Sequence, residues 1–128
     1  TGEKWVTMEL DAAMEKAREL GRLLGQTPEY QALVRARSGV GADRELVAQL
    51  NRLEELERRV ARGLQQGVAP DQELQEEYER VFSQVQAGPA YQALVAAQAN
   101  FDKVLARVNE EIGHGLETAS KSRIILPS

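Results

Sequence analysis

The chain has 128 residues, of which 42% are hydrophobic and 28% are charged, and its formal net charge is -4 at pH 7. This length predicts one folded domain, and this hydrophobic content excludes a chain that is disordered by composition. The absence of cysteine excludes disulfides, thiol nucleophiles and cysteine-ligated iron–sulfur clusters.

The acidic balance argues against direct binding of nucleic acid, because proteins that bind it normally present a basic face. No apolar run approaches the roughly 20 residues that a membrane helix needs. Residues 1–10 also lack the apolar core of a signal peptide. We therefore expect a soluble, cytoplasmic protein that binds neither nucleic acid nor a membrane. Its apolar residues are mainly Leu, Val and Ala, which favours helices over strands.

Two helices are predicted in the first third of the chain. The first is expected to run from a cap at Thr7 to about Leu24, because apolar residues recur there at spacings of three and four. Thr27 followed by Pro28 predicts the start of a second, short helix, with the threonine as its N-cap. This helix is expected to loosen between Ser38 and Gly41.

A long third helix is predicted from Asp43 to Gly67, with Asp43 as its N-cap. Its apolar stripe consists of Leu46, Leu50, Leu53, Val60 and Leu64, with Leu56 beside the stripe. Gly67 and Pro70 are typical of a helix end. Asp71 then predicts the cap of a fourth helix, whose apolar face comprises Leu74, Tyr78, Val81, Phe82 and Val85.

The last helix has the most regular pattern, a seam of three-four spacing that is typical of a coiled coil. The seam consists of Tyr91, Leu94, Gln98, Phe101, Leu105, Val108 and Ile112. Gly113 and Gly115 predict fraying near its end. We therefore divide the chain into a helical domain, residues 1–119, and a C-terminal tail, residues 120–128. The tail contains Ile124, Ile125 and Leu126 just before Pro127, and these three residues either cover the bundle or bind another chain.

Two polar residues interrupt apolar stripes, Glu57 in the third helix and Gln98 in the last. Each either finds a local partner or fixes the register of a helix pair, as buried polar residues can in coiled coils. Glu111 and His114 have the spacing found in di-iron bundles, but the chain has only one histidine. No triad or phosphate-binding loop is recognisable, so we expect no enzymatic activity.

The order of these features resembles the YlbF/YmcA/YheA family of small bacterial helical proteins. The resemblance is carried by residues 17–21, 27–30, 43, 66–67 and 91–112. It implies an all-α, commonly dimeric regulator without enzymatic activity, linked to the ribonuclease RNase Y, mRNA processing, competence, sporulation and biofilm development. Some members act in a complex with cysteine-ligated iron–sulfur clusters. Because this chain has no cysteine, the resemblance does not imply that cofactor here.

We therefore predict an all-α bundle of about five helices that dimerises through its long helices. The expected function is that of a regulatory adaptor, without cofactor or metal, whose partners are a second copy and another protein such as a ribonuclease complex. Two alternatives stay open: a purely structural homodimer, and a metal-dependent enzyme that uses Glu111 and His114 across a dimer. The residues expected at the dimer or partner interface are Leu94, Gln98, Phe101, Leu105, Val108, Ile112, Ile124, Ile125 and Leu126.

Overall fold

Five helices and no strand make up the part of the chain that the computed structural model describes, which is residues 2–125, with side chains for residues 8–121. The prediction of an all-α fold with five helices is therefore confirmed. The helices are α1 (Gly2–Leu24), α2 (Pro28–Ala42), α3 (Arg44–Gln65), α4 (Gln72–Ala87) and α5 (Pro89–Ile125).

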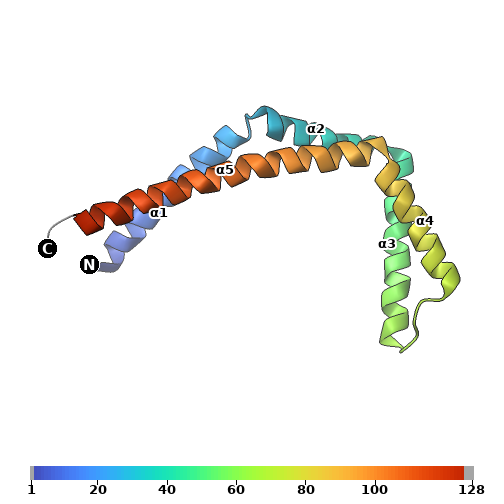
Figure 1. Cartoon of the computed structure of the whole chain (residues 1–128). Helices are drawn as coiled ribbons and strands as arrows, with labels where there is room; N and C mark the ends of the chain where they lie inside the picture. Colours follow the sequence, from blue (N-terminus) through green and yellow to red (C-terminus); the bar gives the residue numbers. More distant parts are fainter. Residues whose placement is uncertain (1, 126–128) are drawn as a thin grey trace.

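The molecule is bent, with a long leg and a shorter hairpin (Figure 1). At 37 residues, α5 spans the whole long leg, which makes it about 55 Å long at 1.5 Å per residue. The helix α2 packs along the first part of α5, and α3 and α4 pack on each other as the hairpin. The start of α1 and the end of α5 lie at the end of the long leg that is remote from the hairpin.

Three helices begin at the capping residues that the sequence indicates. The Thr27 hydroxyl accepts a hydrogen bond from the amide of Tyr30 at 3.2 Å. The Asp43 and Asp71 carboxylates accept from the amides three residues further on, at 3.0 and 2.8 Å. Each cap satisfies one of the backbone donors that a helix start leaves without a partner.

The end of α3 is fixed by two glycines. Gly67 has a positive φ of 75°, and its amide donates to the carbonyl of Leu64 at 3.1 Å. The amide of Val68 donates to the carbonyl of Gly63 at 2.7 Å, which completes a Schellman motif. A Cβ at residue 63 would lie 3.0 Å from the Val68 carbonyl oxygen, so both positions favour glycine. The predicted end of the third helix is confirmed.

Three predicted boundaries are wrong. The backbone is helical from Gly2, so Thr7 lies inside α1 and does not cap it. The second helix continues through Ser38–Gly41 to Ala42, and the last one continues past Gly113 to Ile125. A glycine costs a helix only about 1 kcal/mol, and no proline stops α5 before residue 127. The boundary placed between residues 119 and 120 therefore lies within α5.

The buried core of the described residues is small and lies near the bend and in the hairpin. It consists of Leu33 on α2, Leu46 and Leu56 on α3, Val81 and Val85 on α4, and Ala97 on α5.

The register of the α3 stripe differs from the prediction. Leu56, placed beside the stripe, is 0% exposed, whereas Leu64, placed on it, is 59% exposed. The row that faces α4 therefore passes through Leu56 and Gly63. Because Gly63 has no side chain, the following loop folds back closely at Val68 and brings α4 over Leu56.

Candidate functional site

The first half of the predicted α5 interface is already partly covered within the chain. Leu94, Gln98 and Phe101 are half-buried, in the stretch of α5 against which α2 packs. The Phe101 ring meets the Tyr30 ring of α2 edge to face, with centroids 5.2 Å apart and planes at 62°. Such a contact contributes about 0.5–1.5 kcal/mol beyond the area that it buries. This part of α5 therefore stabilises the monomer itself.

The second half of α5 carries apolar side chains that no helix of the described chain covers well. Leu105 is 37% exposed, Ile112 is 52% exposed, and Val108 is half-buried. Leu116, which the sequence analysis left out, is more exposed still at 67%. It continues the seam four residues after Ile112, so the spacing alone could have identified it.

The helix α1 is similarly exposed. Its large apolar side chains Met8, Leu10, Met14 and Leu23 are all largely accessible, and α1 makes no extensive contact with another helix in the described residues. It approaches α5 at Leu20. There Leu20 lines a groove of about 610 Å³ together with residues of α5 that include Val104, Val108 and Ile112. We call α1 and the second half of α5, residues 104–121, the arms.

The arms give the chain an unusually large surface. Its accessible area is 10228 Å², whereas a compact protein of 14.2 kDa exposes about 6,800 Å². The difference is about 3,400 Å² of total surface, polar and apolar together. A surface of this kind is typical of a chain that buries part of itself against another chain.

Three of the predicted interface residues cannot be placed on these surfaces. The side chains of Ile124 and Ile125, and the whole of Leu126, lie outside the described residues.

The two polar residues of the apolar stripes both have local partners. The Gln98 amide donates to Asp102 Oδ1 at 3.0 Å, and the Tyr78 hydroxyl donates to Glu57 Oε1 at 3.2 Å. Neither residue is buried, and no polar side chain is buried among the described residues. Gln98 is thus paired within its own helix, whereas the partner of Glu57 lies across the hairpin on α4.

The Glu111 and His114 pair lies on the accessible surface of the α5 arm. His114 Nδ1 lies 3.4 Å from Glu111 Oε1, and the two side chains are 64% and 80% exposed. The described residues contain no cluster of three or more histidine, aspartate or glutamate side chains that could hold a metal ion. The pair supplies two ligands on one solvated helix face, which is an incomplete set for most protein metal sites.

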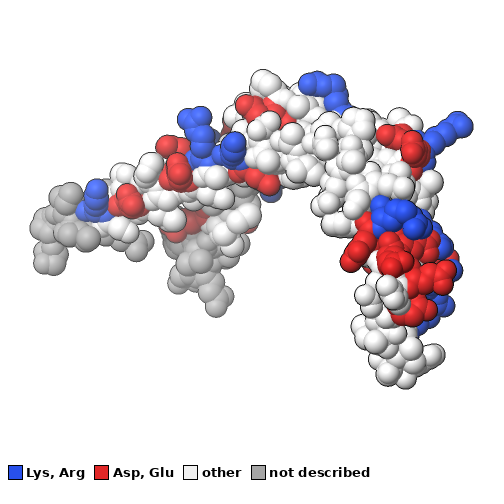
Figure 2. Space-filling model, turned by 45° about the vertical axis from the view of Figure 1, so that its right-hand side comes forward, with Lys and Arg blue, Asp and Glu red and all other residues white. Residues whose placement is uncertain are grey.

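A charged network holds the outer faces of α3 and α4 together. The Arg52 guanidinium of α3 donates to Glu77 of α4 at 2.7 Å and to Glu55 of its own helix at 3.0 Å. The hydrogen bond from Arg52 holds the pKa of the Glu55 carboxyl below its usual value. The bond to Glu77, followed by the bond to Glu55, raises the pKa of Arg52. Figure 2 shows basic and acidic side chains side by side on the hairpin, and mainly uncharged residues toward one end of it.

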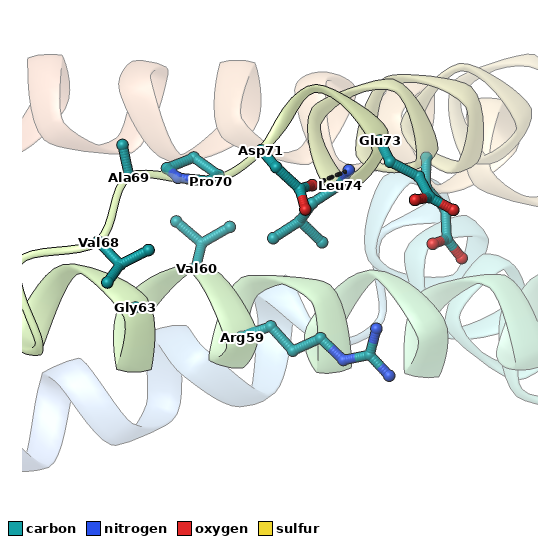
Figure 3. A pocket seen from close by; sticks show the side chains of 10 residues that line it. Arg59, Val60, Gly63, Val68, Ala69, Pro70, Asp71, Glu73 and Leu74 are labelled. Atoms are coloured by element: carbon teal, nitrogen blue, oxygen red, sulfur yellow. Dashed lines mark hydrogen bonds between the residues drawn. The ribbon is translucent and has the colours of Figure 1, made fainter.

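A cavity of about 420 Å³ lies where the loop after α3 folds back (Figure 3). Val60, Val68 and Leu74 point toward one another across it, and Asp71 at its edge caps α4. The Arg59 side chain extends along α3, away from this apolar centre. The charged residues of its lining are Arg59, Asp71, Glu73 and Glu77.

A second, more apolar groove lies beside it in the hairpin. Leu64 of α3 and Tyr78 of α4 line this groove of about 430 Å³, together with Glu57 and Glu79. Periodicity predicts that Leu64 and Tyr78 lie on apolar faces, but it does not indicate that both line one open groove. The grooves and the arms are thus suited to contact with proteins. Among the described residues, no helix is long and apolar enough to cross a membrane.

Comparison with known proteins places the chain in a family. A search of curated proteins finds no match to the chain. The family described as "Control of competence regulator ComK, YlbF/YmcA" matches residues 13–117, which span all five helices and most of the sequence. The resemblance noted from the sequence is therefore confirmed, and the chain belongs to the YlbF/YmcA (Com_YlbF) family.

Proposed function

We propose that this chain is a non-enzymatic adaptor that acts by binding other proteins. The observation that carries the proposal is the exposed apolar surface of the arms, on a chain whose family is described as controlling a competence regulator. Several large apolar side chains exposed on the same helices mark contacts with other proteins. The described residues offer a single solvated Glu111 and His114 pair, and no acid–base or nucleophilic constellation supports an enzymatic alternative.

The first partner is a second copy of the chain. In this homodimer, the arms of one chain cover the arms of the other, with Leu105, Val108 and Ile112 at the centre of the interface. The excess area of about 3,400 Å² per chain is ample for an obligate dimer, which buries about 2,000–5,000 Å² in total. Leu94, Gln98 and Phe101 lie at the edge of this interface, because α2 already covers much of them.

The second partner is a ribonuclease complex of the cytoplasm. The support for it is family membership together with the resemblance, which links related proteins to RNase Y and mRNA processing. In this role the dimer contributes no chemistry. It holds the nuclease or its accessory proteins in a geometry that favours certain transcripts. The chain has no cysteine, so it contributes no ligand to an iron–sulfur cluster of such a complex.

The dimer is tested by light scattering of the wild type and of Ile112→Asp. We expect twice the chain mass for the wild type and the mass of one chain for the variant, because a buried unpaired carboxylate is costly at an interface. Leu64→Asp is the matched control, since Leu64 is similarly exposed but lies on the hairpin. A wild type that is monomeric at all concentrations contradicts the dimer.

The ribonuclease partner is tested in cells. The tagged wild type should co-purify with a ribonuclease or its accessory proteins, and its deletion should change the mapped ends of processed transcripts. Ile112→Asp should abolish both effects if the dimer is the active form. A deletion strain with unchanged transcript ends contradicts the proposed role in mRNA processing.

A further inference from the structure

The apolar groove of the hairpin forms a surface separate from the arms. It is about 430 Å³ in volume and lies between α3 and α4 next to their connecting loop. Its apolar lining consists of Val60, Ala61, Leu64, Pro70, Leu74 and Tyr78, and its polar lining of Glu57, Gln75 and Glu79. We call this surface the hairpin groove.

An aromatic row extends the hairpin groove along α4. Tyr78 and Phe82 are one helical turn apart and their rings stack, with centroids 6.1 Å apart and planes at 10°. Phe82 is 40% exposed, and Leu64 on the opposite helix is 59% exposed. From Leu74 to Phe82 the row spans about 12 Å of α4. An open apolar floor with an aromatic wall is the kind of surface into which an amphipathic helix packs.

No other part of the described chain covers the hairpin groove. Its lining comes from α3, α4 and their loop alone. The remaining helices extend away from the hairpin along the long leg, and the start of α1 and the end of α5 lie at its far end (Figure 1). A dimer formed through the arms would therefore leave the hairpin groove accessible.

The charge at the hairpin groove is unbalanced. Elsewhere on the hairpin, the carboxylates Glu54, Glu55 and Glu77 each form an ion pair with an arginine. Glu57 and Glu79 form no ion pair with any side chain that the structure describes, and no lysine or arginine lines the groove. Two negative charges thus flank an apolar surface, and their complement is a pair of cationic side chains.

We propose that the hairpin groove binds an amphipathic helix of a partner protein. The apolar face of that helix packs on Leu64 and Tyr78, and its lysine or arginine residues lie beside Glu57 and Glu79. The biological role of this site rests on the proposed adaptor function, since the groove is where the adaptor meets its partner. A groove of this size supports a contact at the small end of protein interfaces.

The probes for this site are two synthetic helical peptides of about 18 residues, labelled with a fluorophore. Both carry the same leucine face, but one is flanked by lysines and the other by glutamates. A third peptide has the lysine-rich composition in scrambled order. Binding of each peptide to the full-length protein is measured by fluorescence anisotropy at two salt concentrations.

We expect the lysine-flanked peptide to bind at least about tenfold more tightly than the other two, because only it matches both the apolar surface and the charge. Leu64→Asp should weaken this binding about tenfold or more, as expected at the centre of a small interface. The control Val34→Asp, which changes an apolar residue of α2 with 41% exposure that lies outside both the arms and the hairpin groove, should leave binding unchanged. The double variant Glu57→Gln, Glu79→Gln should weaken binding and reduce its salt dependence.

In the binding assay, any of the following outcomes overturns the proposal: equal binding of the lysine- and glutamate-flanked peptides, equal binding of the scrambled peptide, no binding at all, or wild-type binding by Leu64→Asp. A lower molecular mass of Leu64→Asp in light scattering also overturns it, because the groove would then hold a second copy. Circular dichroism of Leu64→Asp verifies that the variant is folded. The proposed adaptor function is contradicted by a different result: the wild type does not co-purify with a ribonuclease, and deletion of the chain leaves transcript ends unchanged.

Discussion

Substitution of Leu56 by alanine tests the observed packing of the hairpin most directly. Leu56 is 0% exposed and is one of the two largest fully buried side chains of the described residues. Truncation of such a leucine costs about 2–5 kcal/mol, from lost burial and the cavity that remains. Leu64 lies eight residues later on the same helix and is 59% exposed, so Leu64→Ala should change stability by less than about 1 kcal/mol.

The assay is urea denaturation followed by helical circular dichroism, at one protein concentration because a dimer makes stability depend on concentration. We expect a much lower midpoint for Leu56→Ala than for Leu64→Ala, with similar slopes. The reverse order would restore the register predicted from the sequence, in which Leu64 belongs to the buried stripe and Leu56 lies beside it. Equal midpoints would show that α4 does not cover α3 as described.

Three further results are expected. Gly67→Ala should destabilise the protein by about 1–2 kcal/mol, because the φ of Gly67 is positive. Gly113→Ala, at an open position within a helix, should stabilise the protein by about 0.5–1 kcal/mol. Equal midpoints of the two variants in thermal denaturation would contradict both expectations. The lowered pKa of Glu55 contributes stability that is complete above its usual value of 4.5 and is lost as pH falls through the lower folded value; Arg52→Gln should reduce this acid-side loss in denaturation at several pH values. Leu105→Ala should cost about 2–5 kcal/mol if a second copy buries the seam, whereas an unchanged urea midpoint would contradict the proposed dimer.

The helix boundaries that could be predicted from the sequence are those set by local chemistry. Thr27, Asp43 and Asp71 cap helices because a short polar side chain reaches a backbone amide three residues away, and this needs no tertiary contact. Gly67 ends α3 because it takes up a positive φ. Gly113, by contrast, was interpreted as a site of fraying, but no backbone group or proline nearby competes with the helix.

The core could be predicted only in part, because tertiary packing selects one of two overlapping rows. On α3, Leu46, Leu53 and Val60 belong to both rows, and the choice between Leu56 and Leu64 depends on where α4 lies. That position is set by the close turn between Gly63 and Val68, which involves contacts beyond the periodic pattern. Periodicity alone therefore identified the apolar helix but not its exact buried face.

The seam of α5 is a second case in which periodicity does not identify the covering helix. Its three-four spacing predicted an apolar stripe from Tyr91 to Ile112, but spacing does not indicate which helix covers which part. The structure divides the stripe: Phe101 packs against Tyr30 within the chain, while Ile112 is half exposed. The spacing predicts one interface for both residues, although only the apolar surface of the second half of α5 is largely free to contact another chain.

The placement of the two surfaces bears on how such an adaptor could work. The arms and the hairpin groove lie toward opposite ends of a bent molecule, joined by α2 and the first half of α5. A dimer through the arms would thus present two hairpin grooves, one on each chain, without competition between self-association and partner binding. If one partner carries two suitable helices, the second would bind at a high effective concentration, and a weak groove would still support a stable complex. Loss of partner binding in a monomeric Ile112→Asp variant with an intact hairpin would be the signature of this arrangement.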